Sequence, residues 1–112
     1  MKVVVAGTGA AARNHIDAVR RIGGHAVVSV VGRDVEPTAQ FAADHGIDHH
    51  TVDLAEALAQ PGVEAVILAT EPGQERATAE DLARCRYSGV RVYRAAQYCE
   101  RILRRIPVHV LD

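Results

Sequence analysis

Six small residues near the amino terminus have the spacing of a phosphate-binding turn. They follow an apolar run and open a helix-like segment, in the order Gly7-Thr8-Gly9-Ala10-Ala11-Ala12. In a Gly-x-Gly-x-x-Ala turn the first glycine permits a tight bend, the second lets the backbone approach a pyrophosphate, and the third small residue packs where helix meets strand. The free N–H groups of the helix meet the phosphate charge. The pattern predicts a dinucleotide or related nucleotide ligand, the alternative being a turn that binds nothing.

A second pair of residues bears on which nucleotide is bound. Arg33 and Asp34 follow Gly32 at the end of the second apolar run. An acidic residue at this strand end holds the ribose 2′-hydroxyl of NAD, whereas an arginine nearby accommodates the 2′-phosphate of NADP. The expected cofactor is therefore NAD(P), with NADP favoured over NAD. Asp34 is expected mainly to cap the next helix, with contact to the ribose as its alternative role.

Other polar residues give weaker signals. Thr70, Glu71 and Pro72 follow the fourth apolar run, where they form either part of the binding crevice or an ordinary strand-to-helix turn. His49 and His50 are neighbours on a strand and point to opposite faces, so no metal site is expected. No local signature marks a catalytic nucleophile either, and we assign no catalytic residue.

Apolar runs alternate with helix-like segments along the whole chain. Strands are predicted at 2–6, 26–31, 47–52, 63–70, 90–93 and 108–111, and helices at 10–22, 34–45, 53–60, 74–87 and 95–105. Asp53 and Glu56 have the spacing of a capping box. The alternation predicts βαβ units with right-handed crossovers. We therefore expect residues 1–112 to form a single Rossmann-type α/β domain, with a doubly wound, mostly parallel sheet of about six strands and helices on both faces.

Composition limits the remaining classes. The chain has 112 residues, 48% of them hydrophobic and 24% charged, as in a soluble globular domain. Its two cysteines have no metal or redox spacing, and no apolar run is long enough to cross a bilayer, so a cytoplasmic protein is expected. Unpaired sheet edges predict a homodimer or a missing partner domain.

The net charge of −1 conceals an asymmetry between the two ends of the chain. Most of the arginines lie in residues 76–112, whereas most of the acidic residues precede them. This basic C-terminal third fits either an anionic partner, including a membrane surface, or a solvated helix face. Few aromatic residues accompany the arginines, so nucleic acid is not expected as a partner.

Residues 1–70 resemble the N-terminal domain of the glucose–fructose oxidoreductase / inositol dehydrogenase family. The matching stretches are Val3–Gly9, Asn14-His15, Val30–Asp34, Phe41–Gly46 and Pro61–Thr70. The resemblance implies a nicotinamide cofactor bound at Gly7, Gly9 and Ala12, with discrimination near Arg33. It thus agrees with the interpretation of the glycine turn.

The chain departs from this family where the chemistry is expected. The family has a Glu-Lys-Pro motif after the fifth strand, whose lysine is a catalytic group, but here the sequence is Arg94-Ala95-Ala96. Lys2 is the only lysine, and Glu75 stands near the place of the family's histidine. The length leaves no room for the family's substrate domain. We therefore expect an oxidoreductase-like domain without a complete active site.

Residues 80–112 resemble a different family, the bacterial polyprenyl-phosphate sugar transferases. The matching stretches are Asp81–Val92 and Tyr98–Pro107. In those proteins such a segment closes a Rossmann-like cytoplasmic regulatory domain. The alternative function is therefore a non-catalytic domain of polysaccharide biosynthesis that binds a nucleotide or nucleotide-sugar.

Overall fold

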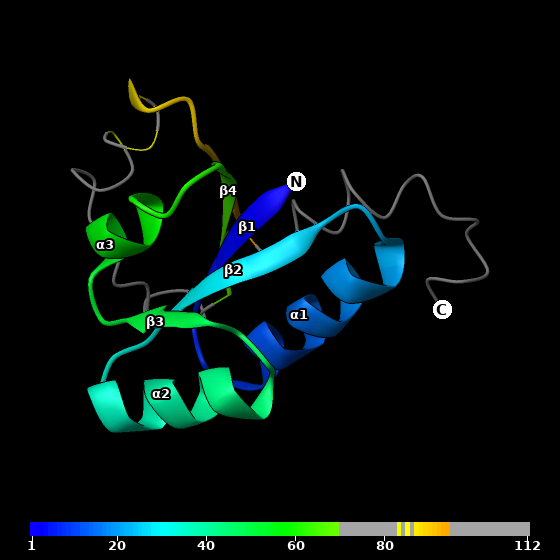
Figure 1. The fold of residues 1–112 in the computed structure, drawn as a ribbon, viewed down its shortest axis with the longest axis vertical. Coiled ribbons are helices and arrows are strands. Elements are labelled where there is room, and N and C mark those ends of the chain that lie inside the picture. Colours follow the sequence, from blue (N-terminus) through cyan, green and yellow to red (C-terminus); the bar gives the residue numbers. More distant parts are fainter. Residues whose placement is uncertain (70–82, 84, 86, 95–112) are drawn as a thin grey trace.

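The computed structural model describes residues 1–69, 83, 85 and 87–94, which build a parallel sheet flanked by helices (Figure 1). Its elements are β1 (Lys2–Ala6), α1 (Ala10–Ile22), β2 (Ala26–Val31), α2 (Val35–Asp44), β3 (His49–Thr51), α3 (Leu54–Leu58), β4 (Val63–Leu68) and β5 (Arg91–Arg94). The strands pair in the order β3-β2-β1-β4-β5, and every pairing is parallel. Within the described ranges, no helix has the length and apolar character needed to span a membrane.

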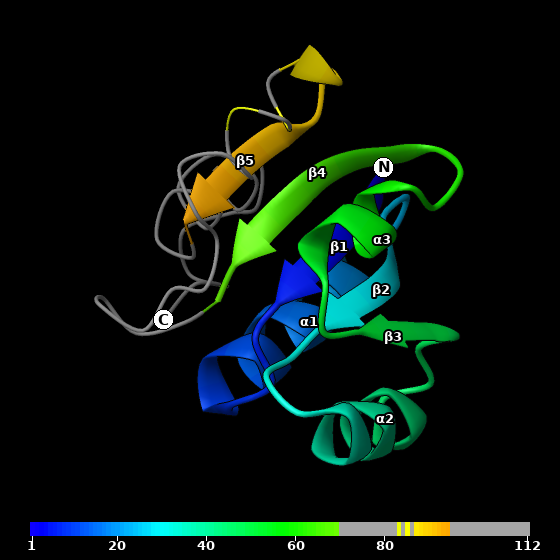
Figure 2. The same ribbon diagram turned by 90° about the vertical axis from the view of Figure 1, so that its left-hand side faces the viewer.

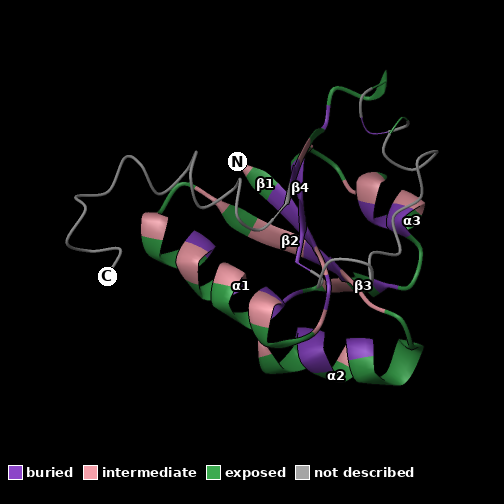
Figure 3. Ribbon diagram, turned by 180° about the vertical axis from the view of Figure 1, so that it is seen from behind, coloured by how far each residue is buried: buried purple, intermediate pink, exposed green. Residues whose placement is uncertain are grey.

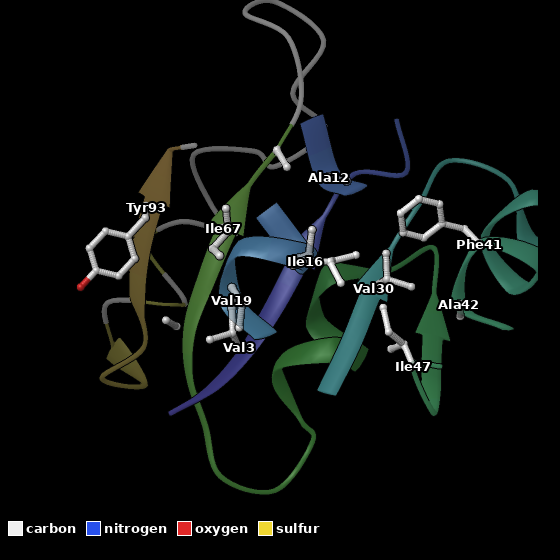
Figure 4. Packing of buried hydrophobic residues seen from close by; sticks show 13 residues of the cluster. Val3, Ala12, Ile16, Val19, Val30, Phe41, Ala42, Ile47, Ile67 and Tyr93 are labelled. Carbon is white, nitrogen blue, oxygen red and sulfur yellow. The ribbon is translucent and has the colours of Figure 1, made fainter. Parts of the chain in front are cut away.

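Helices lie on both faces of the sheet (Figure 2), and an apolar cluster lies between the sheet and the helices on each face. On one face, α1 and α2 pack against side chains that include Val3, Val5 and Ile67 (Figure 4). On the other face, α3 packs against a cluster that includes Val4 and Val66. Central strands buried on both faces need continuous apolar runs, and the middle of β1 is buried throughout (Figure 3). The predicted doubly wound α/β fold is thus confirmed.

The predicted elements in the described part of the chain are present, with small shifts at the ends of several of them. The bounds of β1, α1 and β2 are those predicted, whereas β3 is shorter than 47–52, β4 ends at Leu68 instead of residue 70, and β5 begins one residue later than predicted. The predicted helix 95–105 and strand 108–111 lie outside the described residues, so the expected sixth strand and the single domain over 1–112 stay predictions.

The helix that precedes β5 ends as its sequence predicts. Ala83, Cys85 and Tyr87 are helical, and Gly89 follows them with a φ of 76°. The N–H of Val90 donates to the carbonyl of Cys85 at 2.9 Å, which is the bond of a glycine-terminated helix. The other residues of the predicted helix 74–87 lie outside the described part.

Two predicted helix caps differ from expectation. Asp34 occupies the N-cap position of α2, but its side chain makes no capping hydrogen bond. Asp53 caps α3 through Ala55 N–H at 3.0 Å, yet Glu56 does not complete the reciprocal box. Instead the Thr51 hydroxyl stands between them, donating to Glu56 Oε2 at 2.6 Å and accepting from Asp53 N–H at 3.0 Å. A neighbouring hydroxyl thus replaces the direct bond that the spacing predicted.

Candidate functional site

The carboxyl ends of the central strands meet at one edge of the sheet, where backbone hydrogen bonds hold the following loops together. Gly7 N–H donates to Val31 O at 2.8 Å, and Ala69 N–H donates to Ala6 O at 2.9 Å. The turn after β1 is therefore fixed to the end of β2 on one side and to the end of β4 on the other. Because strand order reverses at β1, this edge is a topological switch point, where open α/β sheets bind ligands.

The glycine turn needs its two glycines for different reasons. Gly7 is buried and has a φ of 141°, a conformation that L side chains rarely adopt. Gly9 is exposed, with a φ of −92° and a ψ of −165°, which any residue adopts. A Cβ built on Gly9 would meet no atom within 4 Å. The protein's own packing therefore does not require glycine at position 9, and the backbone there is open to a ligand.

The amino end of α1 presents donors that the helix itself does not use. Arg13 N–H makes the first helical bond, to Gly9 O at 3.1 Å, so the N–H groups of Ala10, Ala11 and Ala12 have no acceptor within the helix. The N-cap residue, Gly9, has no side chain with which to cap this end, and no acidic residue lies in the first turn. The partial positive charge of the helix terminus is thus uncompensated by its own side chains. This arrangement is chemically suited to an anionic group.

The third small residue of the motif lies where helix and sheet are in contact. Ala12 has no exposed surface and belongs to the apolar cluster beneath α1 (Figure 4). A larger side chain at this position would push α1 away from the sheet, and with it the N–H groups of the first turn. The small side chain of Ala12 thus lets α1 lie close to the sheet.

Arg33 and Asp34 lie in the turn between β2 and α2, at the same edge of the sheet as the glycine turn. Both side chains are exposed, and the Arg33 guanidinium makes no hydrogen bond or ion pair to another described residue. The bond from Gly7 N–H to Val31 O ties this turn to the loop after β1. The structure thus brings Arg33 and Asp34 to the same side of the sheet as Gly7–Ala12.

The remaining predicted site residues are not placed. Thr70, Glu71 and Pro72 lie outside the described residues, although Ala69 just before them is joined to the end of β1. Lys2 begins β1, so it lies at the opposite edge of the sheet, where its Nζ atom donates to Pro61 O at 3.5 Å. The only lysine therefore cannot serve a group bound at the glycine turn.

One feature of this region, Thr38, was not predicted from the sequence. Thr38 is buried beneath the β2–α2 turn, and its hydroxyl donates to Asp34 O at 2.6 Å. A threonine one helical turn after an N-cap is the only sequence signal, and it is a weak one. His15 lies half-buried on α1, where desolvation lowers its pKa from the ordinary value of 6.5.

Known proteins resemble the chain over most of the described region. A family model described as an oxidoreductase family with an NAD-binding Rossmann fold matches residues 1–88. A 4-carboxy-2-hydroxymuconate-6-semialdehyde dehydrogenase from Sphingobium sp. (strain NBRC 103272 / SYK-6) is 43% identical over 70 residues, which are 62% of this chain and 22% of that protein. The resemblance of residues 80–112 to sugar transferases is not supported by these matches.

Solved structures of dehydrogenases and reductases are also similar to the chain. A probable dehydrogenase from Thermotoga maritima superposes with a TM-score of 0.71 at 16% identity, covering 84% of this chain and 27% of that one, and it shows the fold. A biliverdin reductase from Synechocystis sp. PCC 6803, solved with biliverdin and NADP+, gives a TM-score of 0.54 at 28% identity, over 62% of this chain and 22% of that one. The chain thus spans less than a third of the length of these proteins.

Proposed function

The chain belongs to the oxidoreductase family with an NAD-binding Rossmann fold, and we propose that its cofactor lies across the carboxyl edge of the sheet with the pyrophosphate on the Gly7–Ala12 turn. The observation that carries this placement is the open backbone at Gly9, where a Cβ would meet nothing within 4 Å. The N–H groups of the first turn of α1 adjoin this opening. The residues present therefore fit a dinucleotide.

Each part of the turn has a distinct role in this proposal. Gly7 bends the chain toward α1, and Gly9 leaves room for the phosphates. The N–H groups of Ala10, Ala11 and Ala12 and the positive end of α1 hold the phosphate charge. Thr8 lies between the two glycines, and Thr70, Glu71 and Pro72 are proposed to line the crevice after β4 because Ala69 is joined to the end of β1.

We further propose that NADP is preferred to NAD. Gly32 and Arg33 follow β2 where an NAD-binding protein commonly has an acidic residue. The exposed Arg33 guanidinium is uncommitted among the described residues, and its planar fork suits the 2′-phosphate of NADP. Asp34 also has a side chain that no capping bond engages, and it is the group that would meet the ribose if NAD were bound.

The cofactor supplies hydride transfer when bound. This chain's own residues bind and orient it, but the lysine that the family resemblance places after the fifth strand is absent here. That strand is β5, and it ends at Arg94. We therefore propose a cofactor-binding oxidoreductase domain whose full reaction requires groups beyond residues 1–112. A homodimer, a partner domain, contact of the basic C-terminal third with an anionic surface, and a cytoplasmic location stay predictions.

Direct binding tests the cofactor preference. NADPH and NADH are titrated into the protein and followed by nicotinamide fluorescence, for the wild type and for Arg33→Gln. We expect the wild type to bind NADPH more tightly, and the variant to lose about tenfold in NADPH affinity while its NADH affinity changes little, because a charge-assisted bond to the 2′-phosphate is lost. Equal loss for both cofactors, or tighter binding of NADH by the wild type, would contradict the role of Arg33.

A further inference from the structure

The turn that holds Arg33 is fixed from beneath by Thr38. This side chain is 1% exposed and lies on α2, one helical turn beyond Asp34. Its hydroxyl donates to the Asp34 carbonyl at 2.6 Å, and its backbone N–H donates to the same oxygen at 3.1 Å. Two donors thus hold one carbonyl of the turn, the second being the ordinary bond of the helix.

The Thr38 side chain also occupies the space next to the Gly32 Cα atom. A Cβ built on Gly32 would lie 1.9 Å from Thr38 Oγ1 and 2.9 Å from Thr38 Cβ, so the backbone of the turn passes directly against the threonine side chain. Gly32 N–H donates in turn to Thr51 O at 3.0 Å. The backbone is therefore held immediately before and immediately after Arg33.

The consequence concerns how Arg33 presents its charge. A guanidinium recognises a phosphate through two parallel bonds in a fixed plane, which requires that the base of the side chain stay in place. The Arg33 side chain is long and exposed and makes no hydrogen bond or ion pair to another described residue. Within the described part of the chain, its position therefore depends on the backbone of the turn.

We infer that Thr38 is a positioning residue for Arg33 and, through it, a determinant of the choice between NADP and NAD. Because Thr38 is buried against the turn, it would act through the backbone of residues 32–34. This inference rests on the proposed function of Arg33. Removing the Thr38 hydroxyl leaves the Asp34 carbonyl with the helical N–H bond alone, and this should weaken recognition of the 2′-phosphate, which only NADP carries.

The test compares two substitutions that differ in the hydroxyl. Thr38→Val keeps the shape and loses the hydroxyl, whereas Thr38→Ser keeps the hydroxyl and loses a methyl group. Ser29→Ala is the matched control, because Ser29 is a fully buried residue of β2 whose hydroxyl bonds His49 Nδ1 at 2.7 Å, away from the turn. Dissociation constants for NADPH and NADH are measured by fluorescence, together with the melting temperature of each variant.

We expect Thr38→Val to weaken NADPH binding about fivefold, the equivalent of one ordinary hydrogen bond, and NADH binding less than twofold. Thr38→Ser should keep the wild-type ratio of the two constants. Ser29→Ala should melt at a lower temperature with its ratio unchanged, which separates a loss of stability from a loss of positioning. If Thr38→Val does not fold, Thr38→Cys takes its place with the same expectation, since a thiol is a weak donor.

Four results would overturn the inference. A folded Thr38→Val protein with the wild-type ratio shows that the hydroxyl does not position Arg33, while the proposed function stands. An equal loss for both cofactors assigns Thr38 to stability alone. A wild type that binds neither cofactor, or a ratio insensitive to Arg33→Gln, overturns the proposed function and the inference together.

Discussion

Replacing Gly9 by valine should separate binding from stability. The backbone at Gly9 has a φ of −92° and a ψ of −165°, so valine adopts it without strain. A Cβ there meets nothing within 4 Å, so the first carbon of the new side chain disturbs no packing. Gly9 is the N-cap of α1, where valine is less favoured than glycine, so the free energy of unfolding should fall by no more than about 1 kcal/mol.

The same side chain would stand in the space that we assign to the pyrophosphate. Forcing extra methyl groups into an occupied space costs about 1–3 kcal/mol, which corresponds to a loss of affinity of about 5-fold to 150-fold. The assay is a fluorescence titration with NADPH, paired with urea denaturation of the same preparation. The loss should be the same for NADH, because both cofactors carry the pyrophosphate.

Gly23 provides the control at the other end of α1. It has a φ of 75° and a ψ of 154°, a region that only glycine adopts readily, and no atom lies within 4 Å of a Cβ built there. Gly23→Ala should lower stability by about 1–3 kcal/mol through backbone strain and leave the affinity of the folded protein unchanged. Wild-type affinity in Gly9→Val would refute the placement of the phosphates. A large fall in its stability would refute the claim that the position is open.

Two further predictions concern stability alone. Gly32→Ala should lower the free energy of unfolding by about 1–3 kcal/mol, because its Cβ would overlap the Thr38 hydroxyl at 1.9 Å, and an unchanged urea midpoint would contradict that packing. Desolvation lowers the pKa of His15 below 6.5, so the unfolded chain binds a proton more readily than the folded one. Stability should therefore fall as the pH drops below about 6.5. His15→Gln should flatten that decline in urea titrations at pH 5.5 and 7.5, and an equally steep decline would show that another group causes it.

The sequence correctly predicted the bounds of the helices and strands whose ends are marked by glycines or turns. Helix α1 has the predicted bounds because glycines stand at both of its ends, and β2 is bounded by the turns on either side of it. At the sheet edge, β3 is shorter than the predicted strand 47–52, since its pairing with a single neighbour covers only His49–Thr51. The Asp53–Glu56 spacing did not predict that Thr51 would stand between the two residues, because a cross-loop contact has no signature in a four-residue pattern.

The candidate site likewise contains residues that the sequence predicted and one residue that it did not. The glycine turn and Arg33 were predicted from spacing, because a phosphate-binding turn is a local motif followed at a known distance by the residue that meets the ribose. Thr38 could not be predicted as part of this region. Its significance depends on the closeness of its hydroxyl to Gly32 and Asp34, which arises only when α2 folds back against β2.

The position of β1 between β2 and β4 also affects how the candidate site forms during folding. Lys2 pairs with Ala26 on one side and with Val63 on the other, so the second pairing closes a loop more than twice as long as the first. Closing a longer loop costs more chain entropy, and such contacts slow folding. The proposed nucleotide site at the ends of β1 and β4 can form only once that distant pairing has formed. We therefore expect a bound nucleotide to stabilise the contact that the chain forms with the greatest difficulty.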